Sequence, residues 1–147
     1  MDRYPLTLRW TGSTATRTYS RDATAGAPGK PDLALTAGDP ALGDITRWNP
    51  EDILGASLSM CHMLTFLSLC SKVGVDVRSY DDDAAALTST VDKITRVSKI
   101  RLAPTIRLAP GASVEKAESM FEKAHKYCII ANSISAEVEM APTFLVD

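Results

Sequence analysis

The clearest feature of the hydrophobic pattern is a long apolar stretch in the middle of the chain, bounded by helix signals. Asn49 is a good N-cap, Pro50 suits the first helical position, and Glu51 places negative charge in the first turn. Gly74 suits the left-handed residue that often follows a helix. The pattern predicts a helix over residues 50–73, about 36 Å long at 1.5 Å per residue.

The middle of this predicted helix is apolar on nearly every side. Its large apolar residues are Leu58, Met60, Met63, Leu64, Phe66, Leu67 and Leu69. Polar residues such as Ser57, His62 and Ser68 interrupt the stretch, which favours a buried helix of a soluble protein over a membrane span. A helix of this kind needs cover all round. We expect a sheet of the same chain on one side and a second subunit on the rest.

Before this helix, the pattern predicts a meander of three short strands. Residues 5–11 alternate apolar and polar, and residues 16–21 and 32–36 are further strand candidates. Glycine and proline between residues 25 and 31 predict a turn, and residues 38–46 a loop.

After the helix, the pattern predicts two longer strands, a second helix and a last strand. The strands span residues 76–91, 94–108 and 133–140, and Pro104 favours an edge or a bulge in the second. The helix is capped by Ser113, runs to about Ile130, and is ended by Asn132. The order βββ-α-ββ-α-β predicts an α+β fold in a single domain over residues 1–147.

Composition narrows the function classes. The 147 residues are 45% hydrophobic with a net charge of -2, which is typical of a globular protein and gives no sign of a nucleic-acid or anionic-membrane partner. Three cysteines, an odd number, argue against a secreted disulfide framework. The start of the chain, residues 1–5, lacks the features of a signal peptide, so we expect a cytoplasmic protein.

Two cysteines are the candidate reactive groups. Cys61 lies midway along the first helix and Cys128 in the last turn of the second, and neither belongs to a C-x-x-C pair. If packing joins them, one thiol could attack a peroxide and the other condense with the sulfenic acid; alternatively, both fill the core. A helix C-terminus disfavours a thiolate, so Cys128 suits the resolving role, and Cys61 needs a nearby cation such as arginine. Cys70, nine residues after Cys61, faces the opposite side and is interpreted as core.

The two histidines are weaker candidates. His62 follows Cys61 directly and points about 100° away from it on a helix, which makes it a poor general base. His125 precedes Cys128 by one turn; it could face the same site or be a solvated helix residue. The spacing of these two histidines and two cysteines matches no structural zinc pattern, so we expect no metal.

The segment Trp48–Cys61 (WNPEDILGASLSMC) resembles the OsmC/Ohr family of osmotically inducible and organic hydroperoxide resistance proteins. The family's Asn-Pro-Glu helix opening matches residues 49–51, and its first redox cysteine, ten residues after that glutamate, matches Cys61. Its second cysteine matches Cys128 in AHKYCIIANS, although the family often has proline where Ile129 follows here. The order of elements also agrees over nearly the whole chain.

The resemblance implies an intertwined homodimer with the long helices at its centre. It also implies reduction of organic hydroperoxides by Cys61, resolution by Cys128, and a small dithiol or lipoyl group as reductant, with no metal or organic cofactor. In the family, a glutamate and an arginine activate the first thiol. Glu51 matches the glutamate; Arg17 is the first choice for the arginine, before Arg47.

The alternative for each arginine is a surface charge, and for Arg21, a third candidate, we prefer that interpretation. Glu51 and Cys61 are ten residues apart, or about 15 Å along one helix. We therefore hypothesise a site built from both chains of a dimer, in which an antiparallel partner brings its own glutamate near Cys61.

An apolar pocket beside Cys61 would favour alkyl or lipid hydroperoxides, with Met60, Met63, Leu64 and Phe66 as lining residues or as plain core. Two other functions fit the same residues. One is thiol chemistry on a different electrophile, and the other is a non-catalytic dimeric stress or ligand-binding protein whose cysteines are structural.

Overall fold

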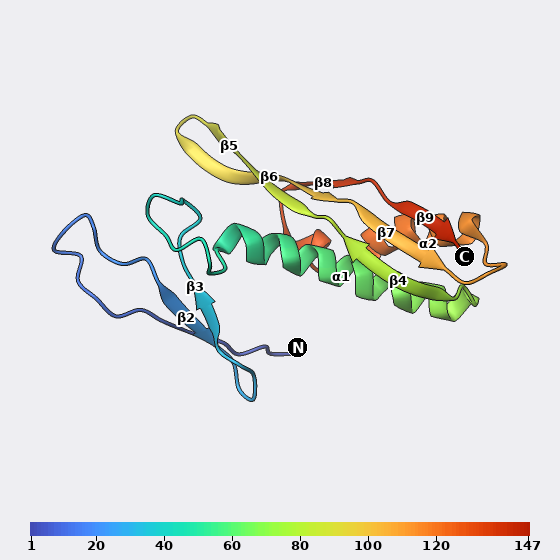
Figure 1. Cartoon of the computed structure of the whole chain (residues 1–147), viewed down its shortest axis with the longest axis horizontal. Helices are drawn as coiled ribbons and strands as arrows, with labels where there is room; N and C mark the ends of the chain where they lie inside the picture. The colour runs from blue at the N-terminus through green and yellow to red at the C-terminus, as the bar shows by residue number, and fades with distance from the viewer. The chain divides into compact units, whose positions relative to one another are not determined.

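The computed structural model describes residues 1–147, which form two compact units, residues 1–53 and 54–147. Strands and helices follow one another along the chain in an α+β fold (Figure 1), as predicted. The single domain over residues 1–147 stays a prediction. Within residues 1–53 the only buried residue is Thr36, so this unit has no hydrophobic core of its own.

The first unit holds a three-stranded antiparallel sheet in the order β1-β2-β3. Its strands are β1 (Thr7–Arg9), β2 (Ala23–Gly26) and β3 (Leu33–Leu35). The predicted meander is present, but the second strand at residues 16–21 is wrong. Those residues lie mostly in turns and irregular chain, and the strand forms where Thr24 can pair with both Arg9 and Ala34.

Helix α1 (Pro50–Val73) has the predicted bounds and crosses from the first unit into the second. The Asn49 side chain accepts a hydrogen bond from the Asp52 N–H at 2.8 Å, which caps the helix. Gly74 follows the helix with a φ of 74°, in the left-handed region that favours glycine.

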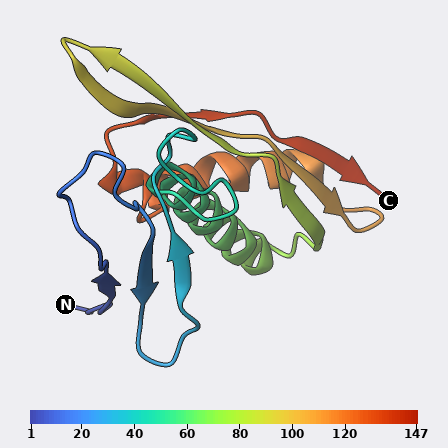
Figure 2. The same cartoon turned by 60° about the vertical axis from the view of Figure 1, so that its left-hand side comes forward.

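The second unit contains two three-stranded sheets, β4-β7-β9 and β5-β6-β8. The strands are β4 (Val77–Asp82), β5 (Ala85–Val91), β6 (Ile94–Leu102), β7 (Pro104–Leu108), β8 (Glu137–Met140) and β9 (Thr143–Val146). The β5–β6 hairpin turns through Asp92 and Lys93, both with positive φ. Its tip is exposed and projects away from the helices of this unit (Figure 2).

The two long strands predicted over residues 76–91 and 94–108 are each interrupted near the middle. The Asp82 carboxylate accepts a hydrogen bond from the Ala103 N–H at 2.8 Å, in place of a strand carbonyl. Pro104 comes directly after Ala103 and has no backbone N–H to donate to a neighbouring strand. Of the last predicted strand, residues 133–140, only Glu137–Met140 forms a strand, which is β8. The pattern did not predict β9, which follows it.

Helix α2 (Val114–Tyr127) begins as predicted, because the Ser113 Oγ accepts a hydrogen bond from the Lys116 N–H at 3.2 Å. The helix follows β7, and β8 and β9 come after it in the chain. Strand β8 pairs in parallel with β6, and β9 pairs in parallel with β7.

The C-terminal end of α2 differs from the prediction, which continued the helix to Ile130. The backbone turns extended at Cys128, and a short 3-10 helix, η1 (Ala131–Ser133), follows. The Asn132 side-chain amide donates to the carbonyls of Lys126 at 3.0 Å and of Cys128 at 2.9 Å. The side chain thereby satisfies the Lys126 carbonyl, which a longer helix would have paired with a backbone N–H, while the Cys128 carbonyl also accepts from the Asn132 backbone N–H at 3.1 Å.

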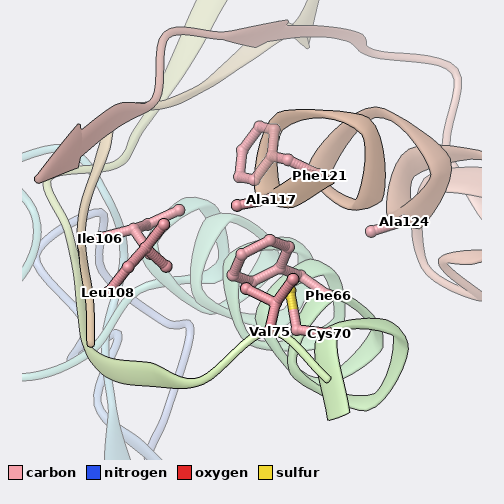
Figure 3. Packing of buried hydrophobic residues seen from close by; sticks show 8 residues of the cluster. All are labelled: Phe66, Cys70, Val75, Ile106, Leu108, Ala117, Phe121 and Ala124. Carbon is pink, nitrogen blue, oxygen red and sulfur yellow. The ribbon is translucent and has the colours of Figure 1, made fainter. Parts of the chain in front are cut away.

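The main core lies between α1, α2 and the β4-β7-β9 sheet. Ile106 and Leu108 of β7 face Phe66 of α1 and Phe121 of α2, and all four are fully buried or nearly so (Figure 3). The two phenylalanine rings meet edge to face with centroids 5.7 Å apart. A second cluster, around Leu58, packs α1 against β6.

Part of α1 stays uncovered within the chain. The helix is long and apolar enough to cross a membrane, and only 28% of its most apolar window is buried. Met60 is 60% exposed and Leu64 is 52% exposed. Because the opposite face packs closely on the sheet and α2, we interpret α1 as a core helix with one unpartnered face.

Candidate active site

The structure brings Cys61 and Cys128 together. Cys61 is half-buried in the middle of α1, and Cys128 is fully buried at the end of α2; both belong to the cluster around Leu58, Ile100 and Leu102. The two thiols are close enough for the Cys61 thiol to raise the pKa of the Cys128 thiol. Both are free thiols in this structure. This arrangement would allow the Cys61 sulfur to react with a molecule at the surface and the buried Cys128 sulfur to react with Cys61 afterwards.

Cys128 sits in surroundings that keep it protonated. Burial raises the pKa of its thiol, and the neighbouring Cys61 thiol raises it further. The Ala131 N–H donates to the Cys128 Sγ at 3.4 Å and opposes this effect, as does the Ile130 N–H. The sequence did not predict these amide donors, and the resolving role of Cys128 stays a prediction.

Cys61 opens into a cleft of about 850 Å³ formed by α1, α2 and the turn after α2. Its lining residues are Ser57, Met60, Cys61, Leu64, Thr65, Ser68, Leu69, Lys72, Lys123, Tyr127, Ile129 and Ile130. Of the four predicted pocket residues, Met60 and Leu64 line it. Met63 does not, and Phe66 lies in the main core, because at about 100° per residue both point to the far side of the helix from Cys61.

Cys70 belongs to the main core, on the face of α1 opposite to Cys61, and is almost fully buried. Burial alone raises the pKa of its thiol to about 11. It therefore remains a neutral packing residue at physiological pH.

His62 is fully buried between α1 and α2, where its ring packs on Phe121 with centroids 4.4 Å apart. Burial lowers its pKa to about 4, and the charge of His125 lowers it further. The Phe121 backbone and the Asp82 carboxylate act in the opposite direction. Neither ring nitrogen has a hydrogen bond of good geometry, so His62 is a neutral core residue rather than a base for Cys61.

His125 lies on α2 and is partly buried, with its Nδ1 atom unpartnered. No three cysteine, histidine, aspartate or glutamate side chains gather in a group that could hold a metal ion.

Arg47 and Arg21 are engaged inside the first unit. Arg47 lies 3.6 Å from the Asp22 carboxylate and 3.7 Å from that of Asp44. The guanidinium of Arg21 stacks 3.6 Å above the ring centre of Tyr19. Both arginines therefore hold the local loop structure.

Arg17 lies in the irregular segment between β1 and β2 and is exposed, with no ion pair. Glu51 lies in the first turn of α1, and its Oε2 atom is buried without a hydrogen-bond partner. No arginine of the same chain pairs with Glu51. Of the three predicted arginines, Arg17 is thus the one whose guanidinium is free to act elsewhere.

The sequence prediction missed most of the cleft residues, among them Lys72, Lys123 and Tyr127. For Lys72 a signal exists, because it follows Cys61 by eleven residues and so lies on the same helix face. Lys123 and Tyr127 approach the cleft only through the packing of α2 on α1, which no local pattern reveals.

A family model described as OsmC-like protein matches residues 43–142, more than half of the chain. The chain belongs to the OsmC-like family. No protein of curated function matches the sequence. The family model confirms the OsmC/Ohr resemblance seen in the sequence.

Solved structures share the fold of this OsmC-like chain. An OsmC-like protein of unknown function from Vibrio cholerae O1 biovar eltor is 29% identical with a TM-score of 0.87, over 97% of this chain and 99% of that chain. An OsmC-like protein from Mycoplasma pneumoniae is 14% identical with a TM-score of 0.75, over 99% and 97%. An organic hydroperoxide resistance protein from Elizabethkingia anophelis is 17% identical with a TM-score of 0.68, over 99% and 99%. The last two similarities show the fold alone.

Buried neutral His62 predicts that this OsmC-like chain loses stability in mild acid. Its pKa is about 4 in the folded state against 6.5 for the free side chain. Between pH 6.5 and pH 4 the His62 side chain is therefore protonated mainly in the unfolded chain. The contribution is fully present above pH 6.5 and declines as pH falls, so that roughly 2 kcal/mol of stability is lost at pH 5. Urea unfolding of the wild type and of His62→Leu at pH 7.5 and 5 measures it. The variant should lose less stability than the wild type and than a His125→Gln control; an equal acid loss in His62→Leu would contradict the assignment.

Proposed function

We propose that the protein is a thiol-dependent peroxidase that reduces organic hydroperoxides to alcohols through a Cys61–Cys128 disulfide cycle. The observation that carries this proposal is the pair of thiols itself: one lines an apolar cleft, and the other is buried within reach of it. Membership of the OsmC-like family supports a redox role. The fold shared with the Elizabethkingia anophelis organic hydroperoxide resistance protein is consistent with it.

In the first step, the Cys61 thiolate attacks the distal oxygen of the hydroperoxide. The S–O bond forms as the O–O bond breaks, and the departing alkoxide takes up a proton to leave as the alcohol. Cys61 is thereby oxidised to a sulfenic acid. The apolar lining of the cleft, including Met60 and Leu64, suits an alkyl substituent better than hydrogen peroxide.

In the second step, the Cys128 sulfur attacks the Cys61 sulfur. The S–S bond forms, the S–O bond breaks, and the hydroxyl group leaves as water with the proton that Cys128 has held. The Ala131 N–H, which already donates to the Cys128 Sγ, stabilises negative charge as that proton departs. A small dithiol or lipoyl group then reduces the disulfide and supplies the two electrons of the cycle.

We propose that Arg17 of one subunit stabilises the Cys61 thiolate of the other subunit and the departing alkoxide, and that Glu51 holds the Arg17 guanidinium, because Glu51 lies about 15 Å along the helix from Cys61 of its own chain. Glu51 has a buried oxygen without a partner, and Arg17 has a guanidinium without an ion pair. Glu51 therefore lacks a donor that Arg17 could supply, and Arg17 lacks a carboxylate partner that Glu51 could supply. A carboxylate that accepts both arms of a guanidinium would fix its orientation.

The proposed assembly is a homodimer in the cytoplasm. The first unit has no apolar core, and Leu8 and Trp10 of its sheet region are exposed. The uncovered face of α1 likewise needs cover. A second copy of the chain is the partner that both surfaces fit, since it would bury them reciprocally. Three free cysteines are consistent with a reducing compartment.

Single cysteine variants test the roles of the two thiols. Cumene hydroperoxide consumption with dithiothreitol as reductant should be abolished in Cys61→Ser, because the attacking sulfur is gone. Cys128→Ser should still react once and leave a sulfenic acid on Cys61 that dimedone traps. Cys70→Ser is the matched control and should keep the wild-type rate, since Cys70 packs in the other cluster. Full activity in Cys61→Ser would contradict the proposal, whereas no peroxide consumption by the wild type would favour a protein with structural cysteines.

The arginine assignment has its own test. Arg17→Ala should slow the single-turnover oxidation of Cys61 by about a hundredfold, the usual effect of removing one preorganised charge-stabilising donor. Arg21→Ala should stay within about twofold, because its guanidinium serves the local loop. Stopped-flow tryptophan fluorescence or quenched-flow mass spectrometry gives the rates. A normal rate in Arg17→Ala with a large loss in Arg47→Ala would transfer the role to Arg47.

A further inference from the structure

Two backbone amides in the turn after α2 act on the sulfur of Cys128. Burial raises the pKa of this thiol, and the N–H groups of Ile130 and Ala131 act in the opposite direction. The Ala131 N–H donates to the Cys128 Sγ at 3.4 Å. Because amide donors stabilise a thiolate more than a thiol, these two groups would prepare the buried sulfur for its attack on Cys61.

A longer α2 would take both amides away from the sulfur. In an α-helix each N–H bonds to the carbonyl four residues earlier. The Ile130 N–H would then bond to the Lys126 carbonyl, and the Ala131 N–H to the Tyr127 carbonyl. Instead the backbone of Cys128 is extended, with φ at −68° and ψ at 116°, and leaves the helix. Both amides are available to the sulfur only because the helix ends at this residue.

The side chain of Asn132 occupies a carbonyl that a longer helix would need. Its amide group donates to the Lys126 carbonyl at 3.0 Å, in place of the Ile130 N–H, and to the Cys128 carbonyl at 2.9 Å. On a continuous helix these two carbonyls would lie about 200° apart around the axis, at about 100° per residue. One amide group could not reach both of them. The Asn132 side chain therefore fits the extended conformation of Cys128 and not the helical one.

The rest of the turn is held by contacts that do not involve this side chain. The Ser133 hydroxyl donates to the Ile129 carbonyl at 2.7 Å, and the backbone N–H of Asn132 donates to the Cys128 carbonyl at 3.1 Å. Ile134 packs against the same core cluster as Cys128. A smaller residue in place of Asn132 should therefore leave the turn folded, and change chiefly the balance between extended and helical backbone at Cys128.

We infer that Asn132 is a positioning residue for the resolving step, because its side chain prevents α2 from continuing through Cys128. The amides of Ile130 and Ala131 thereby stay at the sulfur. This inference rests on the proposed disulfide cycle. It gives Asn132 no part in the first step, since the hydrogen bonds of its side chain go to the end of α2 and not to Cys61.

Quenched-flow intact mass spectrometry separates the two steps in Asn132→Ala. With cumene hydroperoxide, the sulfenic acid on Cys61 should form at the wild-type rate. Its conversion to the disulfide should be about tenfold slower, the effect of losing one hydrogen bond to a charged group. The pH at which this second step reaches half its maximal rate should rise, because the Cys128 thiolate loses its amide donors. Asn132→Asp keeps the shape without the amide donors and should show the same two changes.

Ser133→Ala is the matched control, because its hydroxyl stabilises the same turn through the Ile129 carbonyl. Both steps should stay within about twofold of the wild type in this variant. An unchanged second step and pH profile in Asn132→Ala would overturn the inference. A slowed first step in that variant, or an equal loss in Ser133→Ala, would also overturn it, since Asn132 would then only stabilise the structure.

Diamide as oxidant separates this inference from the peroxidase function. The Cys61 thiolate adds to the N=N bond of diamide, and the Cys128 sulfur then attacks the Cys61 sulfur. The S–S bond forms, the S–N bond breaks, and the hydrazine leaves with the two protons of the thiols. Disulfide formation from this adduct should again be about tenfold slower in Asn132→Ala.

The two oxidants together give distinguishable outcomes. If no hydroperoxide reacts but the diamide adduct resolves more slowly in Asn132→Ala, the peroxidase proposal fails and the positioning role stands. If cumene hydroperoxide is reduced rapidly, and both oxidants give equal second steps in the wild type and in Asn132→Ala, the positioning role fails and the peroxidase proposal stands.

Discussion

The packing of α1 against the sheet and α2 determines where the reactive groups of this protein lie. Leu58 and Phe66 are fully buried two turns apart on one face of the helix, each in a different core cluster. Cys61 lies between them in sequence but turned toward the edge of that face, so its thiol is only half-buried. The end of α2 then places Cys128 directly behind it. A shift of one residue in either helix would separate the two sulfurs.

Burial has a second consequence, which is that the groups near the reaction are neutral. Cys128, Cys70 and His62 all have pKa values moved toward the uncharged form, in each case chiefly because burial removes them from water. The positive charge that a thiolate at Cys61 needs must come from outside this core. We propose Arg17 for this role.

Local sequence signals predicted the elements that carry their own caps. The Asn49 cap and Gly74 defined α1 to the residue, and Ser113 defined the start of α2. The α+β order and the proximity of Cys61 to Cys128 also followed from the sequence, the latter through family resemblance. The helix bounds depend on residues near one another in the chain.

Features that depend on distant residues were not predicted. The interruption of the long strands requires the Asp82 carboxylate to meet the Ala103 N–H. The second strand of the meander forms at Thr24, where both neighbours can pair, rather than at the alternating residues before it. In each case a contact across the fold overrides the local pattern.

The central claim is that Cys61 and Cys128 form a peroxide-driven redox pair. Intact mass and a non-reducing peptide map of the reduced protein, taken after one equivalent of cumene hydroperoxide, test it most directly. The account predicts a loss of about 2 Da and one disulfide, between the Cys61 and Cys128 peptides, with Cys70 still free to alkylate. An unchanged mass with three reactive or buried thiols, or a disulfide that contains Cys70, would contradict it.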